Sequence, residues 1–433
     1  MTVGAAASGG AHPLLPVTAL LGGAVALVAG AVWLLAEPAA LSGHLGSPTA
    51  VALTHAFTLL YVTLVYVGTL QQLPAVLLVT DLAWKRLGAV ALPLLVAGAA
   101  ALVWGFAAGF RPAALALGGL GVTAALALVA AQTLRTARDS PPRDPASRGL
   151  VTAVCYLALT VALGTTLAAS RSSPALAGAL GYPAALHQTT GLIGAFLLGI
   201  AASGHKLLAM FALSKGGATW RVTAVTWCVH ACFAATALAA AAPLAGWPPA
   251  AARVAQAVAV VALSFAGALQ FVEVGALLRR RLRKRLEAPV ERYVLAHAFL
   301  PVAGLLLAAG LREAATVALL LGFVGLAVSG MLVKILSFLT WTRAFGSAAG
   351  RPGPAPLLRD LTRARLEPVI TVGLGFGALA ATAAVAAAST TLAALAASAL
   401  LVGAVAQLWQ TGTVVARTLG GRLTRPREVV TTK

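Results

Sequence analysis

Two histidines near the starts of long apolar segments are the most distinctive reactive residues of this sequence. His55 lies 17 residues before Gln72, and His187 lies 19 residues before Lys206; Gln72 and Lys206 both close an apolar run. A neutral imidazole binds transition metals or haem iron, and ionisable groups inside a bilayer are costly enough to need a partner or a role. The pair therefore predicts a haem or metal site, and the alternative is that each ring hydrogen-bonds to a carbonyl or to interfacial water.

Other ionisable residues fall inside apolar segments without forming an evident cluster. Glu273 lies six residues before Arg279 and is predicted either to pair with basic residues or to handle protons. His297 is predicted to be a satisfied core histidine or to belong to a proton or ligand path. His205, next to Lys206, is expected to reach water or phosphate headgroups at the end of its segment.

Membrane-spanning helices must position these residues. The 433-residue chain is 60% hydrophobic and 10% charged, with a mean hydropathy of +0.92, which is too apolar for a soluble core. Runs long enough to cross about 30 Å at about 1.5 Å per residue predict an all-α polytopic membrane protein with twelve spans. The predicted spans are 14–36, 49–74, 87–110, 112–134, 150–170, 187–211, 220–243, 251–278, 293–311, 314–341, 367–388 and 390–416.

The net charge of +20 is distributed as in membrane proteins rather than nucleic-acid-binding proteins. Four of the 31 Lys and Arg residues (Arg111, Arg171, Arg253 and Arg312) fall in one set of alternate connections, and 27 fall in the other. This bias predicts that both termini and the basic loops are cytoplasmic, in the inner (cytoplasmic) membrane of the cell. The runs Arg279–Arg285 and Arg343–Arg365 are expected to contact anionic lipid headgroups, and no nucleic-acid partner is expected.

Three segments spaced about a third of the chain apart resemble one another: GTLQQLPAVLL from Gly68, GHKLLAMFAL from Gly204 and GMLVKILSFL from Gly330. Aligning the polar residue of each gives intervals of 134 and 128 residues, which predicts three four-helix units at 1–149, 150–288 and 289–433 in a pseudo-threefold ring. The third unit has no histidine around Ala315 to Val317. The alternative is chance similarity between helices rich in Ala, Leu and Gly.

The segments THAFTLLYVTLVYVGTLQQLP, HQTTGLIGAFLLGIAASGHKLLAMF and GLAVSGMLVKILSFLTWTRAFG resemble the haem-copper oxidase subunit I superfamily, in its divergent branch of NnrS-like and oxidase subunit I-like membrane proteins. The resemblance implies that His55 corresponds to a ligand of the low-spin haem. It also implies that the dioxygen-reducing centre is absent and that copper is not expected, because the predicted tenth span, 314–341, has no histidine and the chain has no His-His pair. His187 is then the candidate for the missing second ligand.

These observations predict an integral membrane protein with an oxidase subunit I-like fold that does not reduce dioxygen. It would bind one haem or metal near the outer face, through His55 and His187, and serve a redox or nitric-oxide-related accessory role. Two alternatives stay open: a transporter or exporter of a small molecule, and a non-catalytic structural or assembly subunit. The sequence indicates no particular protein partner.

Overall fold

The chain folds into long helices that run along a common axis. The computed structural model describes residues 10–141, 144–171, 184–345 and 357–419, and these contain no β-strand. Twelve helices in this part of the chain are long and apolar enough to cross a membrane, which confirms the predicted all-α polytopic class.

Eight spans are single helices: α2 (Leu14–Ala36), α7 (Gly88–Ala107), α8 (Pro112–Arg138), α9 (Pro145–Ser170), α13 (Thr219–Ala241), α14 (Pro249–Arg279), α19 (Leu366–Ala386) and α20 (Thr390–Leu419). Four are composite: α4 (Pro48–His55) with η1 (Ala56–Thr63) and α5 (Leu64–Leu70); α11 (Ala184–Gln188) with η2 (Thr189–Leu197) and α12 (Leu198–Ala212); α15 (Ala288–Ala296) with α16 (Phe299–Ala308); and α17 (Arg312–Val317) with η3 (Ala318–Gly325) and α18 (Leu326–Phe345). Short helices α3 (Ala39–Ser42), α6 (Leu73–Leu77) and η4 (Leu358–Leu361) lie in connections.

Two span boundaries differ from the sequence prediction for reasons of helix-end chemistry. The second span ends at Leu70 rather than at residue 74, because Pro74 stands at the start of the separate helix α6. The ninth span begins at Ala288 rather than at 293, with Pro289 in its first turn. The charged residues Glu291 and Arg292 therefore belong to the span, although their polarity suggested a connection.

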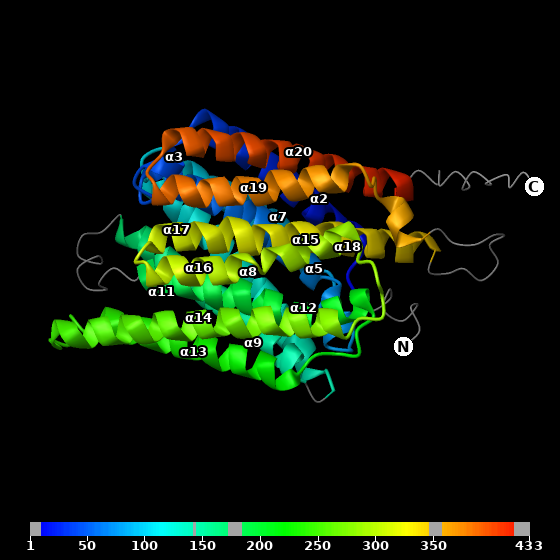
Figure 1. Cartoon of the computed structure of the whole chain (residues 1–433), viewed down its shortest axis with the longest axis horizontal. Helices are drawn as coiled ribbons and strands as arrows, with labels where there is room; N and C mark the ends of the chain where they lie inside the picture. The colour runs from blue at the N-terminus through cyan, green and yellow to red at the C-terminus, as the bar shows by residue number, and fades with distance from the viewer. Residues whose placement is uncertain (1–9, 142–143, 172–183, 346–356, 420–433) are drawn as a thin grey trace, which may run out of the picture.

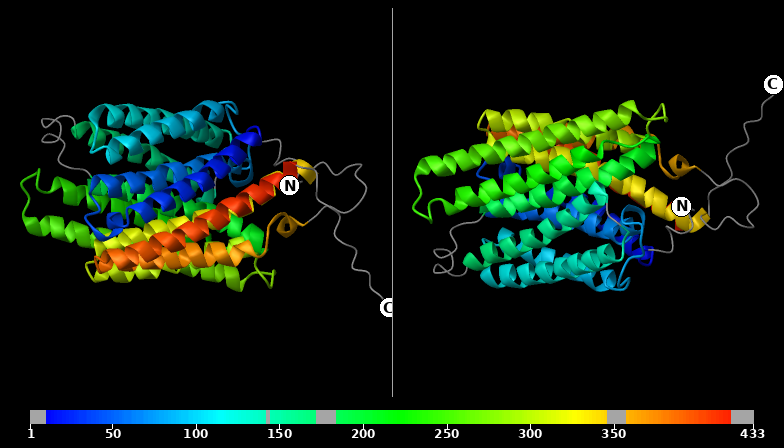
Figure 2. Two further views of the ribbon diagram at one scale, coloured as in Figure 1. Left: turned by 90° about the horizontal axis from the view of Figure 1, so that it is seen from above. Right: turned by 90° about the horizontal axis from the view of Figure 1, so that it is seen from below.

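The helices in the middle of the bundle are the second, sixth and tenth spans. Within the apolar windows of the sixth and tenth spans, 67% and 78% of residues are buried inside the protein, against 22% and 28% for α13 and α14. In Figure 1, α13 and α14 line one edge of the bundle and α19 and α20 the opposite edge. Both views of Figure 2 show α13 and α14 extending beyond the other helices at one end. The low burial of α13 and α14 is as expected for helices that face lipid.

The bundle has two chemically different ends. The ends of α6, α8, α12, α14 and α18 and the short helix η4 lie at one end, which we call the basic end; α2 begins and α20 finishes there (Figure 1). The connections at the opposite end contain α3 and the turns after α7, α13, α16 and α19.

Each central span contains one π-helical stretch of eight or nine residues, namely η1, η2 and η3. η1 begins directly after His55, and η2 begins two residues after His187. A π-helical turn shifts the register of the side chains that follow it, and such turns are frequent at functional sites. The two histidines thus lie at the junctions where α-helix changes to π-helix.

The polar residues that close the central spans each reach the start of an earlier helix. Gln72 donates to the carbonyl of Ala11, just before α2, at 2.8 Å. Lys206 forms an ion pair at 2.6 Å with Asp144, the N-cap of α9. Lys334 forms one at 2.5 Å with Glu287, the N-cap of α15. Three similar contacts therefore hold helix starts at the basic end.

Replacing Asp144 with alanine is expected to lower the free energy of unfolding by about 1 kcal/mol at neutral pH, because α9 loses its N-cap bond to the Ser147 N–H (2.8 Å). Burial acts to raise the pKa of Asp144, but hydrogen bonds from Lys206 and from the Ser147 N–H hold that pKa below its usual range. A carboxyl group with a depressed folded-state pKa stabilises the fold above its unfolded pKa of about 3.9. The stabilisation is lost as the pH falls through the lower folded value.

Thermal unfolding in detergent from pH 7 to pH 3 measures this effect. The difference in Tm between wild type and Asp144→Ala should be largest at pH 7 and should decrease below about pH 4. Asp81→Ala is the control, because the Asp81 side chain is 75% exposed and its ion pair within the described residues is with Lys85, four residues along the chain. A difference for Asp144→Ala that stays constant down to pH 3 would contradict the assignment.

Candidate functional site

The structure brings His55 and His187 together near the opposite end of the bundle, from two different central spans. Their ring centroids are 6.1 Å apart and their planes differ by 12°. His55 closes α4 and His187 lies in α11. Both side chains are half-buried, because they border a cavity.

Each imidazole is held by a hydrogen bond from Nδ1 to a backbone carbonyl. Nδ1 of His55 lies 2.8 Å from the oxygen of Val51, and Nδ1 of His187 lies 3.0 Å from the oxygen of Thr160. A carbonyl only accepts, so both Nδ1 atoms carry the proton and both Nε2 atoms keep a lone pair. The described residues make no hydrogen bond to either Nε2. This is the arrangement that orients histidine ligands in metal and haem proteins.

The cavity beside the two rings has a volume of about 310 Å³ and is mainly apolar. The ring centroid of Phe106 lies 4.6 Å from that of His55, and Phe110 packs edge-on against Phe106. The guanidinium of Arg171, which also lines the cavity, stands 4.5 Å from the centroid of Phe110. A row of aromatic rings therefore extends from His55 to the guanidinium of Arg171, at the end of α9.

Gly164 on α9 makes room for the His187 ring. A Cβ built at this position would lie 2.8 Å from Cε1 and 3.2 Å from Nδ1 of His187. Any larger residue would push the ring and disturb its bond to Thr160. The close approach of α9 therefore places His187.

The tenth span supplies no third imidazole to this cavity. It contributes Thr316 and Leu320, from α17 and η3. The hydroxyl of Thr316 donates to the carbonyl of Arg312 at 3.0 Å, within its own helix. The described part of the chain holds no group of three or more His, Cys, Asp or Glu side chains suited to a metal ion. The site consequently offers two nitrogen ligands.

Glu273 lies at the basic end, where it forms an ion-paired cluster separate from the histidine pair. Its carboxylate is 2% exposed and contacts Nη1 of Arg221 at 2.6 Å and Nδ1 of His205 at 2.9 Å. Gly217 approaches so closely that a Cβ there would collide with the carboxylate. The cluster joins α12, α13 and α14, and pairing with basic residues is one of the two roles predicted for Glu273. His205 is 9% exposed, so it faces this carboxylate more than water.

His297 lies between α15 and α16, with both ring nitrogens engaged. Nδ1 is 2.9 Å from the carbonyl oxygen of Tyr293, and Nε2 is 3.1 Å from Nε2 of Gln270. The residue is 1% exposed, and its ring packs against Phe323 at 5.2 Å. These contacts correspond to a satisfied core histidine, and they leave no nitrogen for a ligand.

Sequence reasoning missed a buried ion pair between α15 and α19. Nη2 of Arg292, a residue with 0% exposure, lies 2.9 Å from Oε2 of Glu367, and Oε1 of Glu367 accepts from Gln410 at 2.5 Å. Arg292 stood outside the predicted spans because the ninth span was expected to start at 293, whereas Glu367 was the first residue of the predicted span 367–388. The signal that would have found it is a Glu and an Arg at the same depth of two spans, on the same side of the membrane.

Comparison with known proteins adds no relative. No protein-family model matches this chain, and no curated protein matches it. We therefore infer the function of the chain from the geometry of the site.

Proposed function

We propose that this integral membrane protein holds a haem through His55 and His187, and that it serves a redox or nitric-oxide-related accessory role without reducing dioxygen. One observation carries the proposal: two imidazoles from different spans lie 6.1 Å apart, each with Nδ1 bonded to a carbonyl and with Nε2 making no hydrogen bond to the described residues. A satisfied core histidine would have both nitrogens engaged, as His297 does.

The spacing of the rings suits a metal between them. Metal–nitrogen bonds of about 2.0–2.1 Å on each side separate two imidazole centres by roughly 6 Å when both Nε2 lone pairs point at the metal. The donor number favours haem over a lone metal ion, because haem iron takes two axial ligands from the protein whereas a single ion commonly needs four.

The cavity also shows what must move when a macrocycle binds. Its volume of about 310 Å³ is at the lower end of ligand pockets, roughly 300–1,000 Å³. Phe106, which packs against the His55 ring, and Phe110, which packs against Phe106, would have to turn away, and Arg171 is a cation in the cavity lining. A haem held by His55 and His187 would supply one-electron transfer.

We further propose that the three four-helix units and the relation to the haem-copper oxidase superfamily are real. Three features support the repeat: π-helical stretches on the second, sixth and tenth spans, polar residues closing those spans, and bonds from those residues to helix starts. We propose, from the charge bias, that the basic end is cytoplasmic, that the membrane is the inner membrane, and that its basic loops contact anionic lipid.

The test is the absorption spectrum of the full chain, expressed with ample haem and purified in detergent. We expect a Soret band whose position shifts on reduction, with about one haem per chain by pyridine haemochrome assay. Elemental analysis of the same sample should find iron and no stoichiometric copper. Protein that is folded but colourless, with neither iron nor another transition metal, would refute the proposal.

A further inference from the structure

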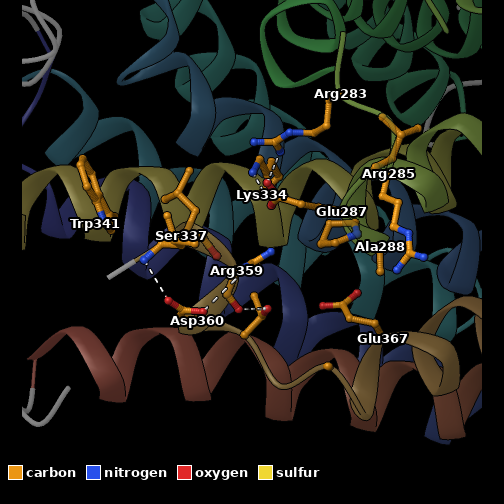
Figure 3. Close-up of a pocket in the computed structure, with 16 residues that line it drawn as sticks. Arg283, Arg285, Glu287, Ala288, Lys334, Ser337, Trp341, Arg359, Asp360 and Glu367 are labelled. Atoms are coloured by element: carbon orange, nitrogen blue, oxygen red, sulfur yellow. Dashed lines mark hydrogen bonds and ion pairs between the residues drawn. The ribbon is translucent and has the colours of Figure 1, made fainter. Parts of the chain in front are cut away.

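A second and larger cavity opens at the basic end, far along the bundle axis from the histidine pair. Its volume is about 850 Å³. Residues from the loop before α15, from α18, from η4 and from the start of α19 line it (Figure 3). Its lining differs from that of the first cavity, since it has three arginines, a lysine and three carboxylates and no phenylalanine or histidine.

The side chains around this cavity carry a net positive charge. Arg283, Arg285, Lys334 and Arg359 line it, together with Glu287, Asp360 and Glu367. Glu367 is already neutralised by Arg292, which lies behind it. With Arg292 included, five cations face three carboxylates, which leaves two positive charges for a ligand.

The single negative charge of Glu287 does not neutralise both of the cations that contact it. Burial acts to raise the pKa of Glu287, but Lys334 and Arg283 hold that pKa below its usual range, so the carboxylate is ionised. One negative charge is thus shared between two cations, Lys334 at 2.5 Å and Arg283 in direct contact. Arg285 forms no ion pair with any carboxylate in the described ranges and is exposed toward solvent.

A buried hydroxyl in the wall of the cavity has no hydrogen-bond partner among the described residues. Ser337 is 2% exposed, and its Oγ makes no hydrogen bond to the described residues, although the side chain lines the cavity. A buried polar atom without a hydrogen bond costs about 1–3 kcal/mol, so such atoms usually meet a ligand or water. Lys334, Ser337 and Trp341 recur at helical spacing along α18 and all face this space (Figure 3).

We propose that this cavity binds a phosphate monoester, a dianion that matches the two excess positive charges and accepts a hydrogen bond from Ser337. Arginine pairs with phosphate through two parallel N–H bonds, which assigns Arg285 and Arg283 to the anion. Trp341, Leu286 and Pro289 supply an apolar wall for the ester group. The phosphate comes either from a lipid headgroup of the phosphatidic acid type or from a soluble ester.

Two binding measurements on the full chain separate these sources. In the first, the chain is reconstituted in phosphatidylcholine nanodiscs with and without phosphatidic acid, and native mass spectrometry counts retained phosphatidic acid. In the second, glycerol 3-phosphate is titrated calorimetrically into the chain in detergent. Retention of phosphatidic acid alone identifies the lipid as the source, whereas binding of glycerol 3-phosphate identifies a soluble ester.

Matched variants tie the binding to this cavity. Arg285→Gln and Ser337→Ala are each expected to weaken binding about tenfold, the effect of losing a hydrogen bond to a charged group. Lys284→Gln removes the same charge from the same loop outside the cavity lining and should change affinity less than twofold. Binding of neither probe, or an equal loss in all three variants, would overturn the proposal. The Soret band reports separately on the histidine pair, so the two proposals fail independently.

Discussion

Glu367→Gln is expected to lower the free energy of unfolding by about 3–5 kcal/mol, because the charge of Arg292 then stays buried without a counter-ion. The guanidinium is 0% exposed, and its Nε and Nη1 atoms have no hydrogen-bond partner among the described residues. Glu367 is therefore its single ionic contact in this part of the chain. Folded proteins have a total stability of about 5–15 kcal/mol, so the yield of folded protein should drop severalfold.

Fluorescence-detected size exclusion and thermal unfolding in detergent measure this loss. The double variant Arg292→Met/Glu367→Leu should recover most of the stability, since replacing both ions with apolar groups removes the unpaired charge. Glu291→Gln is the control, because this neighbouring carboxylate is exposed and forms no ion pair with the described residues. If Glu367→Gln melted at the wild-type temperature, the buried ion pair would have no energetic role.

His55→Ala and His187→Ala should each weaken haem binding by about 100-fold or more. Loss of groups that merely orient a metal ligand typically costs about 10–100-fold, and each of these changes removes the ligand itself. Both should abolish the low-spin spectrum, because one imidazole alone leaves an axial position open. The measurement is haem titration of apoprotein followed at the Soret maximum.

Rescue by added imidazole distinguishes a ligand from a packing residue. In His55→Gly, free imidazole can enter the space that the side chain vacates and should restore the low-spin spectrum. His44→Ala is the matched control, since His44 is exposed at the same end of the bundle and does not line the cavity. Loss of haem by His44→Ala to the same degree, or no difference between His55→Ala and wild type, would exclude the histidine pair as the site.

Composition and the lengths of the apolar runs predicted the features that the bilayer imposes, namely the twelve spans and their helical structure. Twelve apolar runs had to be helices, because a backbone in hydrocarbon must satisfy its own hydrogen bonds. Spacing from the end of each span put His55 and His187 at similar depths, and the structure places their rings 6.1 Å apart. Their role as cofactor ligands stays a prediction.

Features that depend on packing between distant helices could not be predicted from one sequence. The carbonyl of Thr160 that holds His187, and the glycine that admits its ring, lie on a helix 23 to 27 residues earlier in the chain. No residue close to His187 in the sequence indicates these two contacts. The ion pair of Arg292 was hidden by a span boundary five residues too late, and the partner of Glu273 was recognisable only as one of several nearby basic residues.

The two imidazoles are anchored differently, and this makes the pair mechanically asymmetric. His55 bonds to Val51 in its own helix, so its orientation travels with that helix as a rigid piece. His187 bonds to Thr160 on α9, so any sliding of α9 against α11 acts directly on its ring. A strain transmitted through the helices of this region would therefore reach the site through His187, while His55 serves as the fixed reference.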